Sequence, residues 1–93
     1  MTTTKPTRIS DNTFVVGQHL RKARLQAKLT MRAAAQKVRQ YGEHWYHSKI
    51  AKIEYGERRL DVFEFVMLCR IYQIDPLSTL GLLFPQMLGH KTA

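Results

Sequence analysis

Apolar residues in this chain recur at spacings of three and four, the pattern of α-helices that bury one face. In the first such stretch Val16, Leu20, Ala23 and Ala27 fall on one face, while polar side chains fall on the other. No stretch alternates between apolar and polar residues for long enough to indicate a β-strand. The chain is therefore predicted to be all-α.

Good N-cap residues stand before four of the five periodic stretches. In chain order the caps are one of Asp11, Asn12 and Thr13, then Thr30, then Asp61, then Asp75, which is followed by Pro76. No such cap precedes the third stretch. The five helices are predicted to cover about 14–27, Met31–Val38, about 43–55, Val62–Tyr72 and about 76–83.

The third predicted helix lies between two glycines. Gly42 suits a left-handed C-cap position before it, and Gly56 is the natural stop after it. From about Glu43 the helical pattern places Tyr46, Ile50, Ile53 and Glu54 on one face of this helix.

Length and composition restrict the class of protein. A chain of 93 residues suits one small domain, and it holds no apolar run of the roughly 20 residues that span a bilayer. The N-terminal stretch lacks the apolar segment of a secretory signal, and a single cysteine cannot form an internal disulfide. We expect a cytoplasmic domain over residues 14–84, with a flexible N-terminal arm at 1–13 and a C-terminal tail at 85–93.

The positive charge is concentrated in the middle of the chain. Residues 21–59 contain eleven lysines and arginines but three acidic residues, so this stretch carries the whole net charge of +8. Lysine and arginine docked on phosphates release condensed counterions, which favours binding to a polyanion. A basic surface that serves solubility alone is the alternative.

Three segments together resemble one known family. They are Ile50-Ala51-Lys52-Ile53-Glu54-Tyr55-Gly56, Ile74-Asp75-Pro76, and the opening stretch from Val16 to Arg24. Their order and spacing are similar to those of the Cro- and phage-repressor-type helix-turn-helix domain, over about residues 14–83. The resemblance implies a five-helix, lambda-repressor-like fold. It also implies a sequence-specific transcriptional regulator, a repressor that binds double-stranded DNA at a short inverted repeat.

The resemblance also assigns residues to roles. A recognition helix enters the major groove and reads base edges, and the matching positions here are Tyr46, His47, Ser48 and Lys52. Phosphate contacts are expected from the start of the second helix and from basic residues near the third: Thr30, Arg32, Lys49, Arg58 and Arg59. In the family, positions matching Arg24 and Glu54 pair to lock the first helix onto the third.

Two positions depart from the family pattern. The link between Val38 and Ile50 is about five residues longer than usual, so Arg39–His44 resembles an insertion that lengthens either the turn or one of the two helices. Met31 stands where such domains often have a glutamine that contacts DNA.

Several other residues have both a functional and a structural interpretation. Trp45 can stack on a base, but its position favours the core. Cys69 is expected to be buried and inert. His44 and His47 with one distant cysteine provide too few ligands for a metal site, so no metal and no cofactor are expected. Lys5 and Arg8 either enter a minor groove or have no role.

The C-terminal half contains more apolar residues than a small core can bury. The fourth helix has an expected inward row of Val62, Phe65, Val66, Cys69 and Tyr72. A second apolar row and the fifth helix add Phe63, Met67, Ile71, Leu80, Leu83 and Phe84. We expect this surplus to form a homodimer interface. The alternative is that the C-terminal segment folds back over it in the monomer.

The sequence also bears on three other classes of protein: an antitoxin-type module, an enzyme and an RNA-binding protein. An antitoxin-type module would use the apolar C-terminal half to hold a partner protein while also binding its operator. Enzyme activity is not expected, because the sequence shows no paired carboxylates, no nucleophile with a base and no phosphate-binding glycine loop. Charge alone does not exclude RNA, although the aromatic residues do not form a stacking surface.

Overall fold

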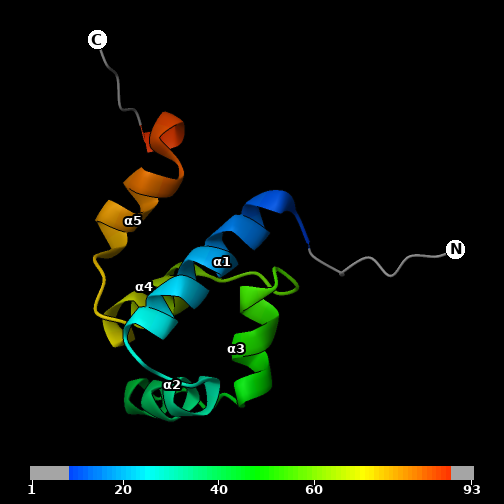
Figure 1. Ribbon diagram of the computed structural model, residues 1–93, viewed down its shortest axis with the longest axis vertical. Coiled ribbons are helices and arrows are strands. Elements are labelled where there is room, and N and C mark those ends of the chain that lie inside the picture. Colours follow the sequence, from blue (N-terminus) through cyan, green and yellow to red (C-terminus); the bar gives the residue numbers. More distant parts are fainter. Residues whose placement is uncertain (1–8, 89–93) are drawn as a thin grey trace, which may run out of the picture.

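The computed structural model describes residues 9–88 and contains five α-helices within that range (Figure 1). They are α1 (Asp11–Gln26), α2 (Met31–Val38), α3 (His47–Glu54), α4 (Val62–Ile71) and α5 (Pro76–Leu83). Single turns of 3-10 helix follow α2 and α5, at Arg39–Tyr41 and Pro85–Leu88. None of residues 9–88 lies in a strand, so the predicted all-α class with five helices is confirmed.

α1 begins earlier than the sequence pattern predicted. Its N-cap is Ser10, whose hydroxyl accepts a hydrogen bond from the Thr13 backbone N–H at 3.1 Å. The three predicted cap residues therefore lie inside the first turn, and the predicted arm boundary after Thr13 falls within the helix. The Ile9 backbone N–H also donates to the Gly56 carbonyl at 2.6 Å, which ties the start of α1 to the end of α3. Lys5 and Arg8 lie outside the described residues.

Three other helices begin at their predicted caps. Side chains of Thr30, Asp61 and Asp75 each accept a hydrogen bond from the backbone N–H three residues later, at 3.0, 2.7 and 2.7 Å. At α4 the bond is reciprocal, because Glu64 accepts from the Asp61 backbone N–H at 3.0 Å. These contacts are local, which is why the sequence alone identified them.

α3 is shorter than predicted, and its predicted start at about Glu43 is wrong. Residues 43–46 are not helical, and Tyr46 is the N-cap, with an extended backbone. Its side chain is 81% exposed, so it does not share the buried face of Ile50, Ile53 and Glu54 as the spacing predicted. Trp45 is the buried residue of this stretch, at 4% exposure. Tyr46 lies four residues before Ile50 and so fits the period of the helix, although it stands at the surface just outside it.

The extra residues between α2 and α3 lengthen the turn and leave both helices short. α2 ends at Val38 as predicted, one 3-10 turn follows, and Gly42 then takes a left-handed conformation with φ of +85°. We call residues 39–46 the extended turn. It places Tyr41, His44 and Tyr46 at the surface, while Trp45 points into the core.

The helices divide the molecule into two ends around α1 (Figure 1). α2 and α3 lie together at one end, and α5 extends away at the opposite end. α3 packs against α1 and α2, whereas α4 packs against α2 and α5. No helix of residues 9–88 combines the length and apolarity that crossing a membrane requires.

The core is built mainly from small and aliphatic side chains of α1 to α4, together with Trp45, Phe65 and Tyr72. Its most buried members include Leu20, Ala34, Val38, Ile50, Ile53, Leu68 and Cys69. Ala34 and Ala35 let α2 approach its neighbours closely. Burial raises the pKa of the Cys69 thiol to about 11, so this cysteine stays protonated and inert.

α4 corrects three sequence predictions. Met67 and Ile71, predicted to line a dimer interface, are buried in this core at 2% and 9% exposure. Val62, predicted to face inward, is 80% exposed. The physical reason is that α4 lies against both α2 and α5, so more than one of its faces is covered. Phe63, at 50% exposure, remains at the surface as predicted.

Candidate nucleic-acid interface

α3 presents one face to the core and the other to solvent. Ile50, Ile53 and Glu54 are buried, while His47, Ser48 and Lys52 are exposed. Tyr46 stands at the N-terminal end of the same exposed face as the cap residue. The four residues predicted to read bases are therefore all accessible on one short helix and its cap.

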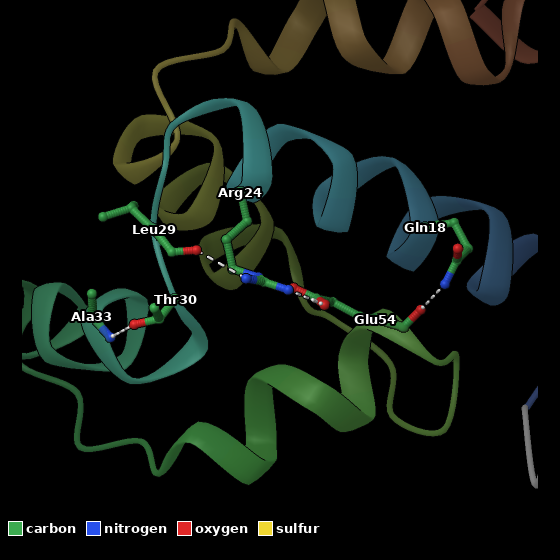
Figure 2. A network of polar contacts seen from close by, with 6 residues as sticks. All are labelled: Gln18, Arg24, Leu29, Thr30, Ala33 and Glu54. Atoms are coloured by element: carbon green, nitrogen blue, oxygen red, sulfur yellow. Dashed lines mark hydrogen bonds and ion pairs between the residues drawn. The ribbon is translucent and has the colours of Figure 1, made fainter.

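The position of α3 is set by a buried ion pair with α1 (Figure 2). Arg24 and Glu54 are 5% and 1% exposed, and two parallel hydrogen bonds join them, from Nε to Oε2 at 2.6 Å and from Nη2 to Oε1 at 3.0 Å. The Glu54 carboxylate raises the pKa of Arg24 above its ordinary value. The predicted pair is thus present, and it joins the last turns of the two helices.

Further hydrogen bonds extend this connection in both directions (Figure 2). Arg24 Nη1 donates to the Leu29 carbonyl at 2.9 Å, in the segment just before α2. The Gln18 side-chain amide donates to the Glu54 carbonyl at 3.0 Å. One glutamate and its arginine therefore orient α1, the lead into α2, and the end of α3 relative to one another.

The start of α2 offers backbone N–H groups beside exposed polar side chains. The Thr30 hydroxyl is engaged by the Ala33 N–H, and Thr30 and Arg32 are both exposed. Helix N-termini attract phosphate because their free N–H groups point outward along the helix dipole. Met31 packs against the core instead of facing solvent fully, which fits its departure from a DNA-contacting glutamine.

The predicted phosphate contacts near α3 differ in their surroundings. Lys49 is partly buried, with Nζ 4.1 Å from the centre of the Trp45 ring and 3.6 Å from Glu64 Oε2. Arg58 Nη2 lies 4.0 Å from the same carboxylate oxygen. Arg59 is exposed. Two of the predicted phosphate contacts are therefore already close to a carboxylate in the free protein.

Sequence reasoning missed Glu64 and Gln18 as parts of this interface. Glu64 follows Asp61 by three residues, the spacing of a capping box, and this signal was present in the sequence. Its closeness to Lys49, 15 residues earlier, is a long-range contact that no local pattern indicates.

Within residues 9–88 no three histidine, cysteine, aspartate or glutamate side chains lie close enough together to hold a metal ion.

Of three comparisons with known proteins, one gives a match, and that match is to a family model. A family model described as a helix-turn-helix domain matches residues 15–79, which is most of the chain and extends from within α1 to within α5. No match was found among curated proteins or among solved structures.

Proposed function

The chain belongs to the helix-turn-helix domain family, in its Cro-like clan, and we propose that it is a sequence-specific transcriptional regulator that represses at a short inverted repeat. Membership of this family indicates that the chain is a DNA-binding regulator. The observation that most supports sequence reading is the exposed face of α3, which presents His47, Ser48 and Lys52 beside Tyr46.

Each of these side chains suits a base edge in the major groove. Lys52 can donate to guanine O6 and N7, and His47 and Ser48 can donate to or accept from base edges. Thr30, Arg32, Lys49, Arg58 and Arg59 would hold phosphates on either side of the groove. The whole net charge of +8 lies in residues 21–59, the part of the chain that includes α2 and α3.

We further propose that the regulator binds as a homodimer through its C-terminal helices. Leu77, Leu82 and Met87 are all at least 70% exposed, and Leu80, Phe84 and Val62 line a mainly apolar groove of about 600 Å³ between α1, α4 and α5. Exposed apolar surface of this kind marks interaction sites. α5 lies at the end of the molecule opposite α2 and α3, so pairing there leaves both recognition helices free (Figure 1).

An antitoxin-type module is the second candidate, and the same groove favours it. A partner protein that filled the groove would replace the second subunit there while the α3 surface still bound an operator. A second protein that copurifies in a fixed ratio would support this alternative over the homodimer.

Selection of bound sequences from a random duplex pool tests the proposed function. We expect an enriched inverted repeat whose half-sites lie about 34 Å apart along one face of the duplex. A single unpaired half-site would contradict the dimer, and a pool with no enrichment would contradict sequence-specific binding.

Two substitutions then separate base reading from phosphate binding. Lys52→Ala should cost about 1–3 kcal/mol on the selected site and relax its sequence preference. Arg58→Ala should weaken binding to selected and unrelated duplexes alike and reduce the salt dependence. Arg70→Ala, at an exposed position on α4, is the control and should change neither. Identical behaviour of the first two variants would refute the division of roles.

A further inference from the structure

A hollow of about 290 Å³ lies where the extended turn meets α3. We call it the turn hollow, and its wall includes Trp45, Tyr46, Ser48, Lys49, Lys52 and Arg58. Three of these residues are cations, and none of the lining residues is acidic. The extended turn contributes two aromatic side chains to this wall, and α3 contributes two lysines.

Glu64 lies next to the turn hollow but does not line it. Its Oε2 atom is 3.6 Å from Lys49 Nζ and 4.0 Å from Arg58 Nη2, while its Oε1 atom accepts from the Asp61 backbone N–H at 3.0 Å. The side chain is 12% exposed. The capping bond therefore holds the carboxylate beside two cations that face the hollow.

We propose that one DNA backbone phosphate seats in the turn hollow, and that Glu64 limits its binding by competing for Lys49 and Arg58. This inference rests on the proposed DNA-binding function. Glu64 attracts the two cations toward its own carboxylate, and this attraction must be given up when a phosphate takes its place. Cations that already pair with the carboxylate also release fewer counterions when DNA binds. Glu64 thus keeps the affinity and the salt dependence below what the cations alone would produce.

Glu64→Gln tests the competition without removing the helix cap. Glutamine at this position still offers a side-chain oxygen to the Asp61 N–H, so α4 should keep its start. We expect the variant to bind the selected duplex roughly two- to tenfold more tightly, with an unchanged thermal unfolding temperature. The slope of log affinity against log salt concentration should become more negative by about one, because about one more counterion is released when DNA binds.

Glu57→Gln is the matched control. It removes the same charge from an exposed position next to Arg58, and within residues 9–88 the Glu57 side chain makes no ion pair. A general change in net charge would affect both variants equally. We expect Glu57→Gln to tighten binding by less than about twofold.

The Lys49→Gln, Arg58→Gln double variant separates competition for these two cations from a general effect of net charge on DNA binding. In that background Glu64→Gln should no longer tighten binding, because the two cations it frees are absent. On the selected duplex, replacing single backbone phosphates by neutral methylphosphonate should likewise identify one phosphate whose loss cancels the gain.

Each other result overturns the inference. Weaker binding by Glu64→Gln would mean that Glu64 positions the cations for DNA, and a gain equal to that of Glu57→Gln would mean a general field effect. A gain that persists in the double-variant background would have the same meaning. If wild type and variants all fail to bind any duplex, the proposed function itself is refuted, whereas binding with unchanged affinity refutes the competition alone.

Discussion

Arg24 and Glu54 are the two residues whose burial most needs a physical explanation. Both lose their hydration, and the cost is offset because two short hydrogen bonds and a third to the Leu29 carbonyl satisfy the guanidinium. The pairing followed from the family resemblance and not from sequence spacing, because the residues are 30 positions apart. Burial itself could not be read from the sequence, since eleven lysines and arginines compete for interpretation as surface charges.

Arg24→Ala should therefore be strongly destabilising. Loss of one partner leaves the Glu54 carboxylate buried without its counterion, which costs about 3–5 kcal/mol. Urea unfolding measures the change. Arg21→Ala, one turn earlier on the exposed face of α1, is the control and should shift the free energy of unfolding by less than about 0.5 kcal/mol. Equal effects of the two variants would show that the pair does not organise the helices.

At the scale of the helix, Gly17 sets how closely α1 approaches the end of α3. A Cβ atom at this position would overlap the Ile53 carbonyl oxygen and lie 2.7 Å from that of Glu54. Both atoms are backbone, so a side chain could not be accommodated by a rotamer change. The glycine in the middle of α1, unfavourable by propensity alone, is explained by this contact.

Gly17→Ala is expected to destabilise the fold by about 1–3 kcal/mol, the usual cost of overpacking. An open helical site would show the opposite sign, because alanine is favoured over glycine by about 1 kcal/mol in a helix interior. Thermal or chemical unfolding distinguishes the two outcomes by sign. Stabilisation by the alanine would mean that α1 and α3 are not in close contact.

The N-cap of α5 should make stability depend on acidity. The Ser78 backbone N–H donates to the Asp75 carboxylate at 2.7 Å and holds the pKa of this carboxyl below its ordinary value of 3.8. Since the unfolded chain has the higher pKa, the charged cap contributes fully above pH 3.8, and its contribution is lost as the pH falls through the lowered folded value.

Asp75→Asn provides the reference, because asparagine also caps helices but does not titrate. The unfolding temperature of wild type minus that of the variant should be constant near neutral pH and should decline below pH 3.8. A difference that stays constant down to pH 2 would show that the carboxylate charge is not stabilising.

A helix end was predicted correctly where residues close in sequence fix it, and incorrectly where tertiary packing fixes it. α2 and the start of α5 were predicted correctly, because cap side chains bond backbone three residues away. The start of α3 was not, because Tyr46 continues the spacing of Ile50 and Ile53 although it is exposed, and no side-chain cap marks the true start. The longer link was recognisable from the spacing of Val38 and Ile50. The sequence did not determine that it forms a 3-10 turn followed by an extended segment.

At the scale of the whole molecule, α5 has the most apolar surface without a neighbour in the described residues. It contacts α4 and the 3-10 turn that follows it, and two of its leucines, Leu77 and Leu82, face solvent. Of the six residues predicted to form a dimer interface, Met67 and Ile71 are core residues, while Phe63, Leu80, Leu83 and Phe84 keep partial or full exposure. The proposed interface therefore moves from the middle of α4 toward α5.

Leu82→Ser should convert the proposed dimer to a monomer without lowering the stability of the domain, because Leu82 is 70% exposed. Sedimentation over a micromolar concentration range measures the change. Leu25→Ser, on the exposed side of α1 at 48% exposure, is the matched control and should leave assembly unchanged. A wild-type chain that sediments at 10.9 kDa over the whole range would refute the dimer.

By itself the sequence determined the helical class, most helix starts and the segment that holds the positive charge. These properties depend on periodicity, caps and charge counts, all of which are set by residues close together in the chain. Tertiary structure decided which apolar rows of α4 are covered and which side chains of the extended turn are buried. It also decided that Glu64 lies beside Lys49 and Arg58. Those outcomes depend on how helices pack, and contacts between residues 15 or 30 positions apart have no local signature.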